Sequence, residues 1–302
     1  MRLTMSRLAV PRRGYHRGVL LLVDLDGVVY RGEMPVPGMA ALLAAREAAG
    51  DTVLFVTNNS RWHRDEYQAR LESMGVLVRQ EHILTAARAT ALVLTEDDAR
   101  PLTMVFGGPG LGRELREIGL RTVAPTERGL AAGPEAVAVG VDFSLTYRRL
   151  STAAEAVRRG ARFVATNRDP IYPSADALLA GAGSMVAAVA IAAGREPDIV
   201  VGKPEPRLFR TAAESVGEAP ERAVVIGDSL YSDIAAANSI GARSVLMLTG
   251  VTTREQADMA MAAPVGTGPL AISRPTAVAA DASELAAVLE RMRADQPAAL
   301  PG

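Results

Sequence analysis

Residues 18–27 read GVLLLVDLDG, an apolar run that ends in two acids and a glycine. Such a run is typical of a strand that is buried on both faces and is followed by a loop. A second run, TVLFVTNNS (52–60), lies between helices expected over 38–50 and 62–75. This alternation of buried strands and helices predicts parallel βαβ units and therefore an α/β fold.

The alternation continues along the chain but is less regular from about 82 to 194, beginning with a helix expected over 82–95. It sharpens again at IVVG (199–202), which we expect to be a further strand of the first sheet. A chain of 302 residues is long enough for two domains. We expect a doubly wound parallel-sheet core in two parts, residues 18–83 and 195–302, an inserted α/β unit at 84–194, and a disordered basic tail at 1–17.

Composition excludes several classes of function. Apolar residues make up 49% of the chain, charged residues 22%, and the formal net charge is −1. Nucleic-acid binding leaves a basic footprint, so we expect no nucleic-acid partner. No stretch approaches the roughly 18 consecutive apolar residues of a membrane helix, so we expect no membrane partner. The absence of cysteine excludes disulfides and thiolate catalysis and fits a cytoplasmic protein.

Four of the expected strands end in polar side chains. They supply Asp24 and Asp26, then Thr57, Asn58 and Asn59, then Lys203, and finally Asp228 and Asp233. Functional groups of an open parallel sheet gather beyond the carboxyl ends of its strands, so these groups meet if the four strands are neighbours. Several carboxylates in one crevice need cations to offset their charge, and a set of oxygen ligands suits Mg²⁺.

Each of these segments alone has an ordinary explanation. The DLD and TNN segments are common turn sequences, and GDSLYSD is a plausible capped start of a helix. The lysine is less ordinary, because Lys203 is the only lysine among 33 basic residues. Arginine and lysine are equivalent on a surface but differ in a site, so this isolation favours a functional role for Lys203.

Taken together, DLDGVVY, TNN, VGKP and GDSLYSDI resemble, in order and spacing, the four motifs of the haloacid dehalogenase superfamily. The long insertion between Asn59 and Lys203 is similar to that of its phosphatase branch with a large α/β cap. That branch includes 4-nitrophenyl phosphatase-like, phosphoglycolate and glycerol-3-phosphate phosphatases. The resemblance covers most of residues 19–250, and Val28, where many relatives carry Thr, is a common variation within the branch.

The resemblance implies Mg²⁺-dependent hydrolysis of a small phosphate monoester, with a small phosphorylated metabolite as the partner. Asp24 would be the nucleophile that forms an aspartyl-phosphate, and Asp26 would protonate the leaving oxygen and then deprotonate water. A halide leaves without a proton, so the second aspartate favours phosphoryl transfer over dehalogenation. The other implied roles are Mg²⁺ binding by Asp24, Asp26 and Asp228, phosphate binding by Thr57, Asn58 and Lys203, and orientation of Lys203 or a metal-bound water by Asp233.

The implied cap would roof the site and limit access of bulk solvent. The stretch ATNRDPIYP (165–173) is similar to cap segments of the branch. We therefore expect Asn167, Asp169 and Tyr172, together with Asn59, to be candidate specificity residues, although ordinary turn residues explain the same stretch. Caps of this branch often take part in dimer contacts, which makes a homodimer through the cap a further expectation.

Two alternatives to hydrolysis remain open at this point. A phosphotransferase would use the same aspartyl-phosphate with an alcohol in place of water, and a catalytically idle binding or regulatory protein would use the fold alone. The run FGGPGLG (106–112) resembles a dinucleotide-binding loop, but its glycines do not fit G-x-G-x-x-G. We expect it to shape a strand–helix turn. The Pro/Gly-rich loop at 264–275 matches no motif.

Overall fold

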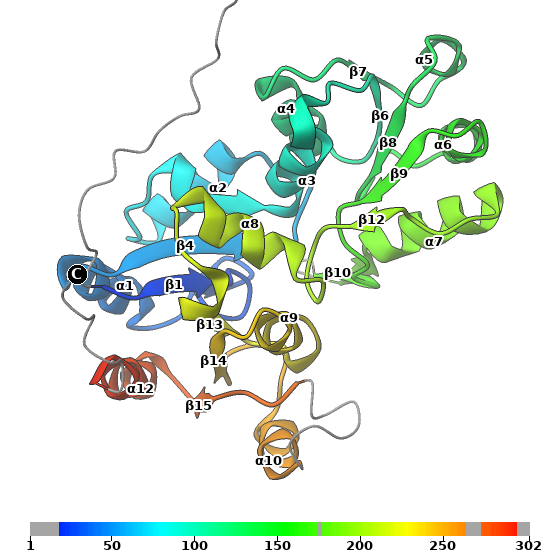
Figure 1. The fold of residues 1–302 in the computed structure, drawn as a ribbon. Helices are drawn as coiled ribbons and strands as arrows, with labels where there is room; N and C mark the ends of the chain where they lie inside the picture. Colours follow the sequence, from blue (N-terminus) through cyan, green and yellow to red (C-terminus); the bar gives the residue numbers. More distant parts are fainter. Residues whose placement is uncertain (1–17, 174–176, 264–272, 295–302) are drawn as a thin grey trace, which may run out of the picture.

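The structure is a computed structural model that describes residues 18–173, 177–263 and 273–294. The tail expected at 1–17 and most of the loop at 264–275 lie outside the described residues. Two parallel sheets with flanking helices make up the described chain (Figure 1). None of the described helices has the length and apolar character needed to cross a bilayer.

The first sheet has six parallel strands in the spatial order β5-β4-β1-β13-β14-β15. Its strands are β1 (Leu20–Val23), β4 (Thr52–Thr57), β5 (Ile83–Thr85), β13 (Val224–Gly227), β14 (Arg243–Met247) and β15 (Ala277–Ala279). Numbered along the chain, this order is 3-2-1-4-5-6, which is a doubly wound arrangement. Such a sheet binds ligands where the strand order reverses, and here that point lies between β1 and β13.

The side chains of β1 point alternately to the two faces of the sheet, and helices cover both faces. Leu21 and Val23 pack with buried residues of three helices on one face, and Leu20 and Leu22 pack with helices on the other. The first group of helices is α1 (Met39–Ala48), α2 (Arg64–Ser73) and α12 (Ala282–Ala294). The second is α3 (Ala86–Leu94), α8 (Arg207–Ser215) and α9 (Ala235–Ser239), and α10 (Arg254–Ala262) packs beside β14.

The second sheet has five parallel strands in the order β12-β9-β8-β6-β7. Its strands are β6 (Thr103–Phe106), β7 (Thr122–Val123), β8 (Ala136–Val139), β9 (Arg162–Ala165) and β12 (Ile199–Val200), and its helices are α4 (Pro109–Glu117), α5 (Glu127–Ala131), α6 (Tyr147–Arg158) and α7 (Ala182–Ala193). Phe106 and Phe163 of this sheet pack with Val157 of α6 and Val189 of α7. The predicted doubly wound core with an inserted α/β cap is confirmed, and we call the five-stranded unit the cap.

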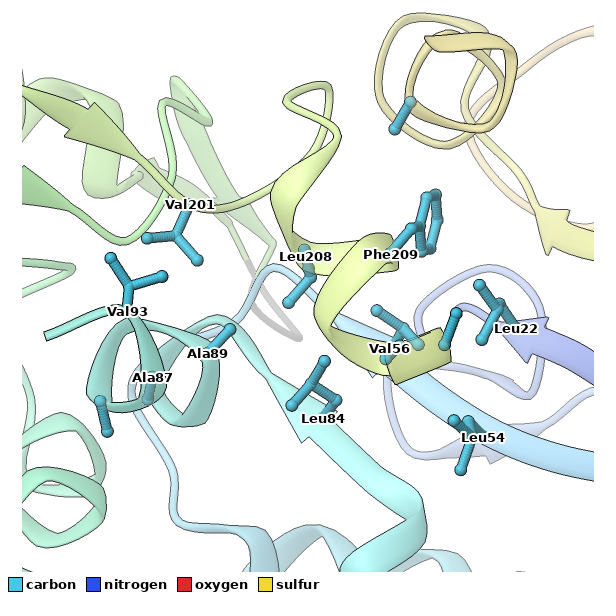
Figure 2. Packing of buried hydrophobic residues seen from close by; sticks show 14 of the residues in the cluster. Leu22, Leu54, Val56, Leu84, Ala87, Ala89, Val93, Val201, Leu208 and Phe209 are labelled. Atoms are coloured by element: carbon cyan, nitrogen blue, oxygen red, sulfur yellow. The ribbon is translucent and has the colours of Figure 1, made fainter. Parts of the chain in front are cut away.

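One apolar cluster joins the two sheets (Figure 2). It runs from Leu22 and Leu54 of the core sheet through Leu208 of α8 to Val93 of α3 and Val201 beside the cap. Cap residues Leu111, Leu115, Ala138 and Val164 belong to the same cluster. The cap therefore packs on the core through apolar side chains as well as through the connecting chain.

Two sequence-based expectations about elements are wrong. The segment expected as a helix over 82–95 begins with strand β5, which pairs with β4 at the sheet edge, and α3 starts only at Ala86. A short apolar run that leads directly into an alanine-rich helix does not reveal the change of structure by periodicity. The run 199–202, expected in the first sheet, contains β12, which pairs with β9 in the cap.

The remaining elements are short. They are β2 (Tyr30–Arg31) with β3 (Met34–Pro35), β10 (Ile171–Pro173) with β11 (Leu178–Ala180), η1 (Gln80–His82), η2 (Glu96–Asp98), η3 (Pro220–Arg222) and the π-helical turn η4 (Leu230–Ile234). β10 lies below β12 and beside α7 (Figure 1), and Ile171 and Tyr172 of β10 and Leu178 of β11 line the same cleft as Asp24 and Asp228. The β10–β11 hairpin therefore lies where the cap faces the reversal point of the core sheet.

Candidate active site

The polar residues that follow three neighbouring core strands meet at the point where the strand order reverses. Asp24 follows β1, Thr57 ends β4, and Asp228 follows β13. The expectation that four neighbouring strands of one sheet supply the site is wrong for the fourth, because Lys203 follows β12 of the cap sheet. Lys203 nevertheless reaches the same cleft, so the site is built from both units.

The cleft has a volume of about 930 Å³. Its lining includes ten of the eleven residues predicted from the sequence, namely Asp24, Asp26, Thr57, Asn58, Asn59, Asn167, Asp169, Tyr172, Lys203 and Asp228. The eleventh, Asp233, lies behind Lys203 and is 1% exposed. The sequence analysis thus identified residues that the fold brings to one place.

Lys203 is the centre of the polar network. Its Nζ donates hydrogen bonds of 2.6 Å to Oδ1 of Asp24 and of 2.6 Å to Oδ1 of Asp233, and the residue is 3% exposed. Burial alone would lower the pKa of Lys203, but the charges of Asp233 and Asp24 raise that pKa above its ordinary value. The lysine therefore stays charged at the floor of the cleft.

The acids around Lys203 carry more negative charge than one ammonium offsets. Carboxylate oxygens of Asp24, Asp228 and Asp233 lie within 4.8 Å of one another. Burial, and then the charge of Asp233, raises the pKa of Asp228 to about 7. Burial, together with the charges of Asp233 and Asp228, also raises the pKa of Asp24 well above its usual range. A divalent cation with a preference for oxygen ligands fits this donor set.

The Asp228 side chain lies in a space that only glycines leave open. A Cβ at Gly27 would lie 2.2 Å from Oδ2 of Asp228, and a Cβ at Gly250 would lie 1.8 Å from the same atom. Gly27 also has a φ of 81°, a conformation that favours glycine. The backbone N–H of Val251 donates to Oδ2 of Asp228 at 2.7 Å. These contacts fix the carboxylate beside the end of β1.

Asp26 lies in the turn that follows Asp24. It is half-buried and forms an isolated β-bridge with Tyr30, and the backbone N–H of Gly27 donates to the Tyr30 carbonyl at 2.7 Å. Burial raises the pKa of Asp26, while the charges of Arg70 and Lys203 lower it. Asp26 therefore lines the cleft in a setting that favours its protonated form more than water does.

Asn58 joins the core loop to Lys203 and to the cap. Its Oδ1 accepts from the Lys203 N–H at 2.7 Å, and its Nδ2 donates to the Lys203 carbonyl at 2.9 Å and to Asp169 Oδ2 at 2.9 Å. Asn167 of the cap donates from Nδ2 to the Asn58 carbonyl at 2.7 Å. The predicted contact of the Asn58 side chain with phosphate stays a prediction, because that side chain already connects Lys203 and Asp169.

Asn59 and Tyr172 face each other across the core–cap boundary. Asn59 Nδ2 lies 3.4 Å from the Tyr172 hydroxyl oxygen. The Tyr172 ring packs edge to face on Phe143, with ring centroids 5.4 Å apart. The Arg61 guanidinium lies 3.9 Å from the Phe143 ring centroid. Asn59 and Tyr172 line the cleft, and Phe143 packs on the Tyr172 ring without lining it.

Several residues of the cleft escaped the sequence analysis. Arg31, Tyr231, Gly250 and Val251 also line it. The analysis looked for strands that end in acids, amides or a lysine, and β14 ends in the uncharged stretch LTG. A glycine directly after an apolar run was the available signal, because a close approach of the backbone to a ligand or an acid often requires one.

Comparisons with known proteins agree with this geometry. A family model described as haloacid dehalogenase-like hydrolase matches residues 21–121, and a second model of the same kind matches residues 200–285. Human chronophin is 38% identical over 260 residues, which cover 83% of this chain and 87% of chronophin.

Solved structures show the same likeness. The p-nitrophenyl phosphatase from Archaeoglobus fulgidus superposes with a TM-score of 0.80 at 32% identity, covering 90% of this chain and 99% of that one. The glycerol phosphate phosphatase from Mycobacterium tuberculosis, solved in complex with magnesium, gives a TM-score of 0.77 at 35% identity, covering 89% of this chain and 76% of that one.

The chain belongs to the haloacid dehalogenase-like hydrolase family. The predicted enzyme class, a phosphoric monoester hydrolase with an α/β cap, is confirmed by relatives that are themselves phosphatases.

Proposed function

We propose that this phosphatase hydrolyses a small phosphorylated metabolite through a phosphoryl group carried on Asp24, with Mg²⁺ as cofactor. The pair of 2.6 Å hydrogen bonds from Lys203 to Asp24 and Asp233, beside the buried Asp228, is the observation that carries the proposal. A buried lysine among three acids gives a site that holds a phosphoryl group between an anionic nucleophile and cations.

In the first step a carboxylate oxygen of Asp24 forms a bond to phosphorus while the bond from phosphorus to the ester oxygen breaks. Asp26 donates a proton to that leaving oxygen, which departs as an alcohol. Lys203, Thr57 and Asn58 stabilise the negative charge on the phosphoryl oxygens. Asp233 holds the Lys203 ammonium in place through its 2.6 Å hydrogen bond.

In the second step water attacks the phosphorus of the aspartyl-phosphate. Asp26, now a carboxylate, accepts a proton from that water, the bond from phosphorus to Asp24 breaks, and orthophosphate leaves. The same residue thus serves as acid and then as base. Because Asp26 is half-buried, both the leaving group and water can reach it.

Asp24 and Asp228, with the main-chain carbonyl of Asp26, would hold Mg²⁺. When bound, the ion offsets the charge of these acids and of the phosphate, which would otherwise repel each other. Both oxygens of Asp233 already accept hydrogen bonds, from Lys203 and from the Ser229 N–H, so this acid serves the site indirectly. This division of roles agrees with the donor geometry described above.

We also propose that Asn59, Asp169 and Tyr172 contact the leaving group, because they line the same cleft as Asp24 and Asp26. Asn167 lines it too, but its hydrogen bonds to the Asn58 carbonyl and the Asp169 N–H support a role in holding the loop. Its assignment to specificity stays a prediction.

The division of the chain into a core at 18–83 and 195–302 and a cap at 84–194 also stays a proposal. Strand β12 at Ile199–Val200 supports a second boundary several residues later than 194. Exposed apolar side chains on the cap, including Phe143, Tyr147 and Leu178, support a homodimer through that unit, which light scattering after gel filtration would test. The cytoplasmic location rests on the absence of cysteine.

Turnover of 4-nitrophenyl phosphate tests the proposed function. We expect hydrolysis with Mg²⁺ and none with EDTA or after Asp24→Asn. Added acceptor alcohols separate hydrolysis from transfer, because a phosphotransferase would form new phosphate esters. Failure of the well-folded protein to hydrolyse any phosphate ester would favour a binding protein and would overturn the proposal.

A further inference from the structure

The cap sheet has a reversal point of its own, and a core loop fills it. Numbered along the chain, the cap strands lie in the order 2-1-3-4-5, and ligands of such sheets bind beyond the carboxyl ends of the first and third strands. Here those strands are β6 and β8. Gly108 after β6 and Gly140 after β8 lie against Arg61 and Ser60, so the core occupies the place where a ligand would bind.

The core segment in question, residues 57–63, runs from the last residue of β4 to the residue before α2 and contains Thr57 and Asn58, the two phosphate-binding residues proposed above. The cap contacts several residues of this segment. Asn167 donates to the Asn58 carbonyl at 2.7 Å, and the Thr166 hydroxyl lies 3.2 Å from the Ser60 hydroxyl. Because Ser60 is 1% exposed, these contacts are closed to solvent.

Gly110 of α4 makes the closest contact. Its N–H donates to the Arg61 carbonyl at 2.8 Å. A Cβ added at Gly110 would lie 2.3 Å from the Trp62 carbonyl carbon, whereas real side chains do not approach a backbone so closely. The glycine run that superficially resembles a nucleotide-binding loop thus brings the cap helix onto the core backbone.

Glu114 lies one helical turn after Gly110, on the same face of α4. Its carboxylate is 0% exposed and accepts from Nε of Arg64 at 2.9 Å and from the Arg64 backbone N–H at 3.3 Å. Arg64 is the first residue of α2, directly after the 57–63 segment. Arg64 also donates from Nη2 to Glu117 of the same helix at 2.9 Å, so two carboxylates of α4 hold the first residue of α2 in one geometry.

We propose that Gly110 and Glu114 of the cap are positioning residues for the phosphate-binding segment 57–63 of the core. The cap then serves as a fixed brace for the core loop as well as a roof over the cleft. The proposal rests on the assignment of Thr57 and Asn58 to phosphate binding made above. Neither Gly110 nor Glu114 lines the cleft, so both act through the segment.

The test compares three variants of the full chain with the unaltered protein. Gly110→Ala introduces the clash with Trp62, and Glu114→Gln keeps the size of the side chain but sets an amide N–H₂ against the donors of Arg64. Gly112→Ala is the matched control on the same helix, because its Cβ would meet the flexible end of the Arg116 side chain at 3.1 Å and Val105 at an ordinary contact distance of 3.8 Å. The readouts are KM and kcat for 4-nitrophenyl phosphate and the Kd of orthophosphate with Mg²⁺ by calorimetry.

We expect kcat/KM to fall roughly 10- to 100-fold in Gly110→Ala and Glu114→Gln, mainly through a higher KM, with a parallel weakening of orthophosphate binding. Gly112→Ala should match the unaltered protein. A lower melting temperature with unchanged KM and orthophosphate Kd would overturn the proposal, as would an equal effect of Gly112→Ala.

Two further outcomes are also decided by this design. If Gly110→Ala does not fold, as judged by circular dichroism, Glu114→Gln decides alone. If the unaltered protein hydrolyses no phosphate ester, the proposed function fails, while the comparison of orthophosphate affinities still decides whether the two residues position the segment.

Discussion

At the scale of single residues, the site depends on side chains whose contacts another residue type would not reproduce. Lys203 is the only lysine of the chain, and its ammonium contacts two carboxylates while 3% of the residue is exposed. A compact charge on a flexible stem reaches both acids. A planar guanidinium needs more space and a different set of acceptors.

Lys203→Arg should therefore lose most activity without loss of fold. We expect kcat to fall by roughly 10²- to 10³-fold, the usual cost of one displaced charge-stabilising donor. The rate of 4-nitrophenyl phosphate hydrolysis measures the loss, and far-ultraviolet circular dichroism checks the fold. Near-normal turnover would contradict the role given to this lysine.

Gly27→Ala tests the packing of Asp228. The new Cβ would lie 2.2 Å from Oδ2 of Asp228 at a φ of 81°, so both strain and a clash arise. We expect a loss of stability of about 1–2 kcal/mol from the backbone and a loss of most Mg²⁺-dependent activity. Gly119→Ala is the control, because Gly119 has a φ of 88° with no atom within 4 Å of its added Cβ and does not line the cleft.

Denaturant unfolding and activity as a function of Mg²⁺ concentration separate the two effects. Gly119→Ala should show the stability loss and keep its activity. Full activity of Gly27→Ala at ordinary Mg²⁺ concentrations would show that activity does not depend on this position of the Asp228 carboxylate.

At the scale of elements, the sequence predicts those parts of the site that local chemistry determines. The sequence identified the acids after β1 and β13 and the TNN segment at the end of β4. A buried strand appears in the sequence as an apolar run, and polar residues mark its end. The sheet to which β12 belongs could not be identified from the sequence, because the pairing of a short apolar strand depends on long-range packing. Lys203 lies in the cleft as expected, although the strand before it belongs to the cap.

The Gly-rich turn before α4 shows the same limit. Its glycines were expected to shape a turn, and α4 indeed begins at Pro109, directly after Gly108. Their contact with residues 60–62 depends on two segments that are distant in sequence, and no local pattern signals it. For this reason, the contacts between the core and the cap could not in general be predicted from the sequence.

Leu208→Ala probes the element that joins the two units. Leu208 on α8 is fully buried in the cluster shared by core and cap (Figure 2). Its truncation should lower the free energy of unfolding by about 2–5 kcal/mol. Leu77→Ala, at a leucine that is 80% exposed, should have little effect. Equal stability of the two variants in urea titrations would show that α8 is not packed as described.

At the scale of the whole molecule, the core and the cap share one apolar cluster and one site. The cluster includes residues of β1, α3, α4, α8 and β9, and the site takes Lys203 from the end of the cap sheet. Separation of the two units would expose this apolar surface and break the contacts of Lys203. Their folding is therefore expected to be coupled.

Differential scanning calorimetry tests this coupling. We expect one cooperative transition in which the calorimetric enthalpy equals the van't Hoff enthalpy, because neither sheet keeps a complete interior without the other. Activity and near-ultraviolet circular dichroism should be lost together. Two resolved transitions would show that the cap and the core unfold independently.

Metal binding should also be visible in the stability of the whole chain. Mg²⁺ at about 100 times its Kd should add about 2.7 kcal/mol, since the unfolded chain lacks the assembled acids. Asp228→Asn should remove this gain, yet be at least as stable as the unaltered protein in EDTA, because it takes one charge from a crowded group of acids. Equal stabilisation of both proteins by Mg²⁺ would place the ion elsewhere.

The central claim is that Asp24 carries the phosphoryl group during turnover. Rapid acid quenching of the working enzyme, followed by peptide mapping in a mass spectrometer, tests it most directly. We predict the added mass of one phosphoryl group on the peptide that contains Asp24, and none after Asp24→Asn. A phosphoryl group found on another residue, or steady turnover by Asp24→Asn, would contradict the account.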